Sequence, residues 1–268
     1  MPYADLPGDL RMYYEDDDFT DPWRSSETVI MQHGQAKNSQ LWYAWVPLLA
    51  RDYRVIRVDG RGFGRSSVPA AGYAWSLGGF ATDLKNLMDH LGIEKAHLIG
   101  ETIGGTIAMQ FALQYPNRLN SVTTCSSPFK FVGVPTYQDY YRLVEEKGVE
   151  GWVRETIGNR LPPGKVDPAH VEWYVGQMSS TSRQVVLETL AYLATVDLSP
   201  VMPEIAVPAL VISGADAGAS AERSRAQASL IPGCRLVEIP GVSGFVQHEA
   251  PEQAAAAWRE FAQSLIAR

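Results

Sequence analysis

The chain has little of what would link it to a membrane, to nucleic acid or to an oxidising compartment. It has only two cysteines in 268 residues, Cys125 and Cys234, so reduced thiols are expected. Its 23 basic residues are outnumbered by 30 acidic ones, and a net charge of −7 disfavours nucleic acid or an anionic membrane as partner. No run approaches the roughly 20 apolar residues of a membrane span. The acidic amino terminus is unlike a signal peptide. We therefore expect a cytoplasmic protein.

What the chain does contain is a regular alternation of short apolar, β-branched segments with helical stretches. A hydrophobic fraction of 46% is ample for a core. The alternation predicts a parallel sheet with crossover helices. The acidic run at residues 15–18 is expected to be a solvated turn. The predicted strands cover residues 28–32, 53–58, 96–99, 122–125, 209–213 and 235–239.

The segment Gly100-Glu101-Thr102-Ile103-Gly104-Gly105 has the pattern of a sharp strand-to-helix turn. In the G-x-S-x-G motif of such turns a serine stands at the tip as nucleophile. Here the tip is Thr102. That position requires a positive φ, which a β-branched side chain tolerates badly. Thr102 is therefore expected to be a poor nucleophile.

Three further motifs, read in order with this turn, resemble the α/β-hydrolase superfamily. They are His33-Gly34-Gln35, the D-x-R-G-x-G-x-S run of residues 59–66, and the Gly244-Phe245 segment that leads to Pro251-Glu252. The overall pattern is most similar to enol-lactonase-type members. The resemblance implies an α/β fold with a mostly parallel central sheet flanked by helices and a helical cap inserted after the sixth strand. The core would comprise residues 1–126 and 204–268, and the cap residues 127–203.

In that superfamily an acid and a histidine complete the catalytic triad. The acid position, usually the last of G-x-x-D, is occupied by Ala217, one residue after Asp216. The register of Phe245 and Gln247 puts Gly244 at the histidine position. All three triad positions, Thr102, Ala217 and Gly244, are therefore predicted to be degenerate. A Ser-His-Asp mechanism needs a base beside the hydroxyl and an acid that orients it. The small replacements are also expected to enlarge the floor of the pocket.

The resemblance also implies an oxyanion hole, because that feature is built from backbone amides. The two positions are Gln35 and Ile103. His33 is expected to brace the preceding loop, and His248 to lie near the surface. The cap is rich in aromatic residues, which either pack the cap or line a pocket below it. We predict as substrate-binding residues Gln35, Trp45, Tyr137, Tyr140, Trp173, Tyr174 and Phe245.

Three functions remain open at this point. One is an ester or lactone hydrolase with a shifted triad of Thr102, His248 and Asp216. The second is a catalytically dead peptide-binding protein. The third is a cofactor-independent, metal-independent enzyme that stabilises an enolate in the oxyanion hole and uses a substrate carboxylate as base.

We favour the third function, because it needs no protein nucleophile. In its loss of the triad the chain resembles the atypical α/β-hydrolase-fold peptide epimerases, as in the biosynthesis of the peptide antibiotic bottromycin. That resemblance implies an isomerase in natural-product biosynthesis that epimerises an aspartyl residue. Its partner would be a modified peptide or another hydrophobic small molecule.

Overall fold

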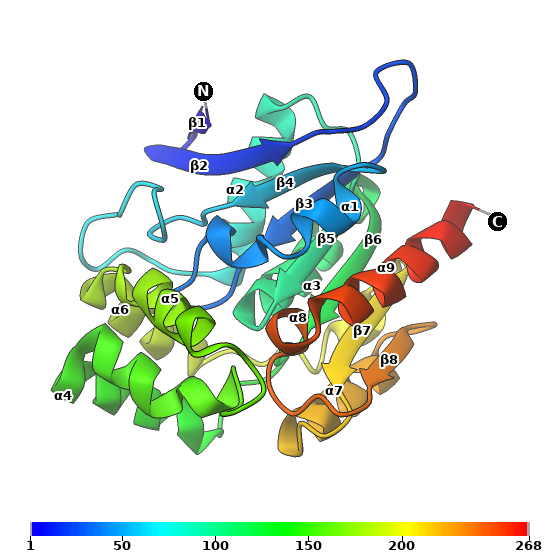
Figure 1. The fold of residues 1–268 in the computed structure, drawn as a ribbon. Coiled ribbons are helices and arrows are strands. Elements are labelled where there is room, and N and C mark those ends of the chain that lie inside the picture. Colours follow the sequence, from blue (N-terminus) through cyan, green and yellow to red (C-terminus); the bar gives the residue numbers. More distant parts are fainter. Residues whose placement is uncertain (1, 267–268) are drawn as a thin grey trace.

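The computed structural model describes residues 2–266, and its centre is one eight-stranded sheet (Figure 1). The strands lie in the order β1-β2-β4-β3-β5-β6-β7-β8. β1 pairs with β2 and β2 with β4 in antiparallel fashion, and the remaining neighbours are parallel. Their bounds are β1 Tyr3–Leu6, β2 Leu10–Asp17, β3 Thr28–Gln32, β4 Arg54–Val58, β5 Ala96–Glu101, β6 Leu119–Cys125, β7 Ala209–Gly214 and β8 Arg235–Ile239.

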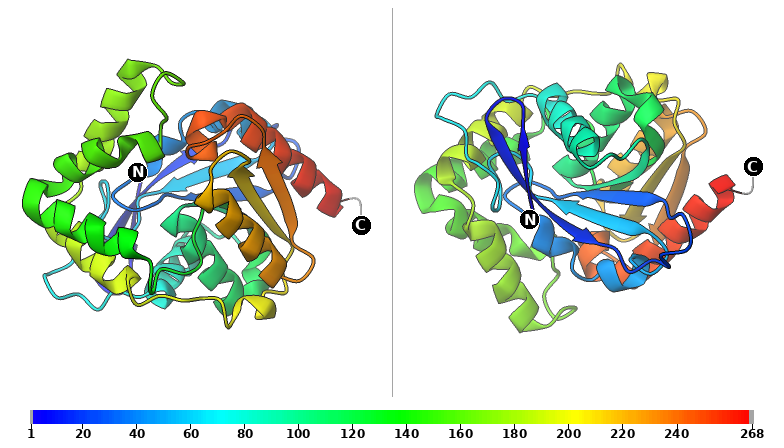
Figure 2. Two further views of the ribbon diagram at one scale, coloured as in Figure 1. Left: turned by 90° about the horizontal axis from the view of Figure 1, so that it is seen from below. Right: turned by 90° about the horizontal axis from the view of Figure 1, so that it is seen from above.

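Helices cover both faces of the sheet, as crossover connections between parallel strands require (Figure 2). α2, α3 and α7 lie on one face, and α1 and α9 on the other. The bounds are α1 Val46–Leu49, α2 Leu77–His90, α3 Ile103–Gln114, α7 Ala219–Leu230, α8 Val246–Glu249 and α9 Pro251–Ile266. Short 3-10 helices span η1 Ser39–Trp42, η2 Pro116–Arg118, η3 Ile157–Asn159 and η4 Met202–Glu204.

The central strands bury side chains on both faces, which explains their continuous apolar sequence. In β3, Ile30 packs with the α2–α3 side while Val29 and Met31 pack with the α1–α9 side. This alternation follows from the two-residue period of a strand. All five residues of β3 are buried.

Three helices between β6 and β7 form the cap: α4 Pro135–Thr156, α5 Pro168–Ser179 and α6 Arg183–Leu193. They gather at one end of the sheet (Figure 1) and have their own apolar cluster around Trp152 and Tyr174. The helical periodicity of the cap sequence predicts helices at 137–147, 149–157, 168–178 and 182–195. The structure joins the first two as α4, with a kink at Gly148, whose φ of 72° breaks the helical conformation.

One sequence prediction about the sheet is wrong. The acidic run at residues 15–18 is not a turn, because its first three residues form the end of β2. The neighbouring strand β4 supplies arginines to this strand. Arg54 pairs with Asp16 at 2.7 Å and Arg57 with Asp17 at 2.7 Å. Cross-strand pairing with opposite charges therefore makes a strand of an acidic segment.

No helix among residues 2–266 is long and apolar enough to cross a membrane.

Candidate active site

The turn between β5 and α3 has the strained geometry expected of a nucleophile elbow. Thr102 adopts φ 49° and ψ −122°, and α3 begins at the next residue. The glycines on both sides are required by close packing. A Cβ on Gly100 would lie 2.2 Å from the Gly104 carbonyl oxygen, and a Cβ on Gly104 would lie 2.3 Å from the Gln32 carbonyl oxygen. The predicted positive φ of Thr102 is therefore confirmed. A β-branched residue in this conformation stores strain of about 1–3 kcal/mol.

The loop after β3 is held beside the elbow by His33. The Nδ1–H of His33 donates to the Gly34 carbonyl at 2.7 Å, and its Nε2 accepts from the Gly60 amide at 2.9 Å. This pair of bonds fixes one neutral tautomer, and burial lowers the pKa of His33. The predicted bracing role of His33 is therefore consistent with its contacts.

The amides predicted to form the oxyanion hole flank the cavity above the elbow. Gln35 and Ile103 both line it. Within residues 2–266 neither backbone N–H donates a hydrogen bond, so both are available to a ligand oxygen. The Gln35 side chain is used elsewhere, because its amide donates to Thr189 Oγ1 of α6 at 2.6 Å. This contact ties the oxyanion loop to the cap.

A buried charged cluster adjoins the elbow, because its central residue, Glu101, directly precedes Thr102. The carboxylate of Glu101 accepts hydrogen bonds from Lys37 Nζ at 2.5 Å and from the Gln247 side chain at 2.6 Å. Nε2 of His248 lies 2.8 Å from the same carboxylate and 3.2 Å from Lys37 Nζ. The side chains of Lys37 and Glu101 are 1% and 0% exposed, so this is an ion pair in a low-dielectric environment.

The pKa shifts in this cluster follow from burial and from the neighbouring charges. Burial opposes ionisation of Glu101, but Lys37 and His248 outweigh it and hold its pKa well below the ordinary range. Burial lowers the pKa of Lys37 to about 8 despite the adjacent carboxylate. Burial also lowers the pKa of His248, with the nearby Lys37 adding to the effect.

These contacts correct the prediction that His248 lies near the surface. His248 is 7% exposed, lies on α8 and packs edge-on against Tyr174 at 5.2 Å. They also separate the members of the shifted triad. Asp216 is exposed and accepts from the Gly241 amide at 2.9 Å, so it does not orient His248. Across residues 2–266, Thr102 and His248 share no hydrogen bond.

The two other predicted triad positions also face the cavity. Ala217 and Gly244 both line it. The expectation that Gly244 enlarges the floor is wrong, however, because the cap fills the space beside it. A Cβ at Gly244 would lie 2.6 Å from both the Arg160 carbonyl oxygen and Pro162 Cδ. The Gly244 amide donates to Glu249 at 2.6 Å, which fixes the loop under the cap.

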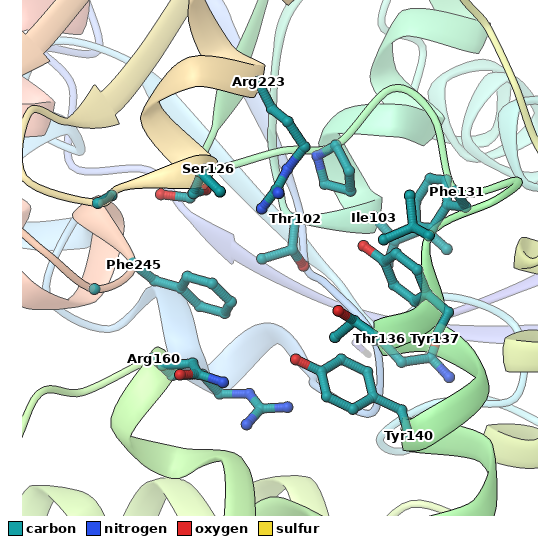
Figure 3. Close-up of a pocket in the computed structure, with 18 of the residues that line it drawn as sticks. Thr102, Ile103, Ser126, Phe131, Thr136, Tyr137, Tyr140, Arg160, Arg223 and Phe245 are labelled. Carbon is teal, nitrogen blue, oxygen red and sulfur yellow. The ribbon is translucent and has the colours of Figure 1, made fainter.

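The cavity itself lies between the elbow and the cap and has a volume of about 520 Å³ (Figure 3). This is within the usual range of small-molecule sites. Phe131, Tyr137, Tyr140, Trp152 and Phe245 give it aromatic walls. Four basic residues, Lys37, Lys130, Arg160 and Arg223, line it without an acidic one among the described lining residues.

Four of the seven predicted substrate-binding residues lie on this wall, namely Gln35, Tyr137, Tyr140 and Phe245. The other three do not line the described cavity. Trp45 is fully buried and donates to the Gln247 carbonyl at 3.1 Å. Tyr174 is fully buried in the cap cluster, and Trp173 packs against Tyr43 at 5.2 Å. Their aromatic side chains serve the packing that helical aromatics usually serve.

Sequence reasoning missed the residues that give the cavity its charge. Lys37 follows the His33-Gly34 motif by three residues, and a lysine so close to an oxyanion loop is a signal that could have been used. Arg160 and Arg223 carry no such signal, because nothing local distinguishes them from surface arginines. Within the part of the chain that the structure describes, no group of three or more His, Cys, Asp or Glu residues could hold a metal ion.

The fold agrees with that of the protein's relatives. Residues 27–164 match the family model of the α/β-hydrolase fold, so the chain belongs to this family. A 2-hydroxy-6-oxononadienedioate/2-hydroxy-6-oxononatrienedioate hydrolase of Paraburkholderia phymatum is 31% identical over 233 residues, which are 78% of this chain and 75% of the relative. The 3-oxoadipate enol-lactonase 2 of Acinetobacter baylyi is 28% identical over 189 residues, or 70% of each chain.

Solved structures give the same architecture. The enol-lactonase of Burkholderia xenovorans superposes with a TM-score of 0.88 at 23% identity, covering 97% of this chain and 99% of that one, which shows the fold. A thermophilic esterase of Thermogutta terrifontis, crystallised with malate, superposes with a TM-score of 0.86 at 26% identity and covers 99% and 97%. By their names, these relatives are all hydrolytic enzymes.

Proposed function

We propose that the protein is a non-hydrolytic enzyme that stabilises an enolate in its oxyanion hole. In the form that we favour, it epimerises an aspartyl residue of a modified peptide by exchange of the Cα proton. The observation that carries this proposal is that, across residues 2–266, Thr102 shares no hydrogen bond with His248 while the amides of Gln35 and Ile103 donate none. We take Ala217 and Gly244 as the positions of the acid and the histidine, and both line the cavity.

The chemistry is proton transfer next to a carbonyl. The substrate carbonyl oxygen accepts from the amides of Gln35 and Ile103. The substrate's own carboxylate takes the Cα proton, the electron pair of the C–H bond forms a C=C bond, and the π pair of the carbonyl moves to its oxygen as an enolate. Water delivers a proton to the opposite face of the enolate, which inverts the centre, and the carboxylic acid releases its proton to water. A well-oriented intramolecular base has an effective molarity of about 10⁵ M or more, so the protein needs to supply only orientation and electrostatics.

The second candidate is hydrolysis of an ester or lactone, because the relatives of the chain are hydrolytic enzymes. Asp216 cannot serve as the acid of the shifted triad, since it accepts a hydrogen bond from the Gly241 amide. The pair that remains is Glu101 with His248, at 2.8 Å. Both groups are buried, and Thr102 is not hydrogen-bonded to either of them across residues 2–266. A pure peptide-binding protein would use the same cavity without changing the ligand.

The test is incubation of aspartyl peptides in D₂O, followed by mass spectrometry and chiral amino-acid analysis, beside a panel of p-nitrophenyl acetate and enol-lactones. We expect one deuteron per turnover with inverted configuration, and no hydrolysis. Thr102→Ala should retain much of the exchange, because its hydroxyl has no role in it. The matched asparagine peptide should bind but hardly exchange, since an amide is a far weaker base.

Three results would count against the proposal. Hydrolysis that Thr102→Ala abolishes would establish the second candidate. Binding without exchange would establish a binding protein. Equal exchange of the asparagine peptide would show that the base belongs to the protein.

A further inference from the structure

The charge of the cavity opposes the charge of the whole protein. The chain carries a net charge of −7, yet the described lining of the cavity has four basic residues and no acidic one. Two of the four are neutralised by carboxylates outside the lining: Lys37 by Glu101 at 2.5 Å and Lys130 by Asp197 at 2.9 Å. Arg160 and Arg223 are left.

Arg160 is buried and has no carboxylate partner among residues 2–266. It follows η3 in the cap and is 5% exposed, and its Nη1 donates to the carbonyl and the hydroxyl of Thr156. The guanidinium stacks over the Trp152 ring at 5.1 Å. Among residues 2–266 no acid lies within ion-pair distance, and Nε and Nη2 donate to no described acceptor. A buried, unpaired guanidinium is costly, which makes an anionic ligand its natural complement.

Arg223 approaches the same cavity from the opposite wall. It lies on α7, and Figure 3 shows its side chain extended toward Thr102, with Arg160 on the other side of the cavity. Arg225, two residues on, is instead paired with Glu238 at 2.9 Å, whereas Arg223 has no carboxylate partner in the described chain. Ala219 and Ser220, at the amino end of α7, also line the cavity, so the helix dipole adds to the positive potential.

We propose that Arg160 and Arg223, which enter the cavity from opposite walls, are its carboxylate-binding pair, so that the ligand is an aromatic or apolar carbonyl compound that carries a carboxylate. The aromatic walls receive the apolar part, and the guanidinium groups offer paired N–H donors that match a carboxylate. This inference rests on the proposed function and deepens it. A carboxylate held by arginine is a weaker base. An aspartyl substrate therefore needs two carboxylates, one held by the arginines and one free to take the proton.

The test uses hippurate, which has an aromatic ring, an amide carbonyl and one carboxylate, and its neutral isostere hippuramide. Calorimetry should show saturable binding of hippurate and at least tenfold weaker binding of hippuramide. Arg223→Gln should weaken hippurate binding at least tenfold. Because Arg223 is exposed, this variant should fold like the wild type. Arg225→Gln is the matched control on the same helix and should leave the affinity within twofold. Arg160→Gln should act like Arg223→Gln, and added salt should weaken binding.

Equal binding of hippurate and hippuramide, no saturable binding of hippurate, or an unchanged affinity in Arg223→Gln would each overturn the inference. The deuterium assay reports separately on the proposed function. Arginine-dependent hippurate binding without exchange on any aspartyl peptide would refute the function and leave the pair in place. Cα proton exchange in an aspartyl peptide, together with hippurate binding that does not depend on the two arginines, would refute only the proposed carboxylate-binding pair.

Discussion

The two sides of the elbow differ in how much of the hydrolase site they keep. On the oxyanion side, His33 braces its loop through Gly34 and Gly60, and two free amides face the cavity. On the opposite side, the loops after β7 and β8 carry Ala217 and Gly244, and the cap backbone at Arg160 lies against Gly244. One side presents the amides of Gln35 and Ile103 to the cavity, and the other has Ala217 and Gly244 at the predicted positions of the acid and the histidine.

The backbone and the side-chain features of such a site can therefore change independently of each other. The oxyanion amides depend on the glycine-rich packing of strand, loop and helix, which the fold itself requires. The triad depends on single side chains, which substitution removes without disturbing the sheet. Glu101, Lys37 and His248 form a buried cluster that connects the two sides. Substitutions in this cluster therefore test how strongly the two sides depend on each other.

The largest effect is expected from Glu101→Gln. The change leaves Lys37 buried without its carboxylate, and breaking a buried ion pair costs about 3–5 kcal/mol. Urea unfolding at pH 7 should show this loss. Glu150→Gln is a matched control, because Glu150 pairs with Arg154 on the exposed surface, where such pairs contribute about 0–1 kcal/mol. If the two variants lost equal amounts of unfolding free energy, the buried ion pair would contribute no more to stability than an exposed one.

Gly34→Ala should damage the oxyanion side. A Cβ at this position would lie 1.9 Å from Thr102 Oγ1 and 3.2 Å from the Glu101 carbonyl oxygen. Overpacking of this kind costs about 1–3 kcal/mol. Displacement of an oxyanion donor lowers a catalysed rate by about 10²-fold or more. Thermal unfolding and the exchange assay measure the two effects. Gly176→Ala, with open space around its Cβ, is the control. A Gly34→Ala variant with unchanged stability and exchange rate would contradict the proposed oxyanion hole.

Gly244→His tests whether the missing base can be restored. The new Cβ would collide with the Arg160 carbonyl oxygen and with Pro162, so a loss of about 1–3 kcal/mol is expected. No esterase activity should appear, since Ala217 cannot orient an imidazole. Gly244→Ala should show much of the same destabilisation, because the collision occurs at Cβ. A stable Gly244→His variant that hydrolyses p-nitrophenyl acetate would show that the cap leaves room for a histidine at this position and that the base can be restored.

The smallest effect is a pH dependence shared by both sides. Burial lowers the pKa of His33 and of His248 below the ordinary 6.5. The unfolded chain therefore binds protons more readily than the native one below pH 6.5. The stabilisation is fully present above that pH and is lost as the pH falls through the folded values. Urea unfolding at pH 7.5 and at pH 5.5 should show lower stability at pH 5.5. His248→Gln should reduce the difference in stability between the two pH values. If that difference is unchanged, it arises from the other histidines.

Much of the fold was predictable from sequence because it depends on local patterns. The parallel strands were found from their β-branched apolar runs, and the elbow from its glycines, which fit where a Cβ on Gly100 or Gly104 would clash. The cap helices were found within a few residues. The acidic end of β2 was mispredicted as a turn because it is stabilised by Arg54 and Arg57 from β4, and a cross-strand pairing has no local signature.

The order of residues along the chain already shows which side chains are available: Thr102 at the tip, and Ala217 and Gly244 at the predicted positions of an acid and a base. What surrounds these residues depends on how distant segments pack together. This packing buries His248 against Glu101, places the Arg160 backbone over Gly244, and leaves two arginines facing one cavity. Residues 37, 101 and 248, or 160 and 223, meet through long-range packing, and neither burial nor charge compensation between such distant segments is encoded in the local periodicity of the chain.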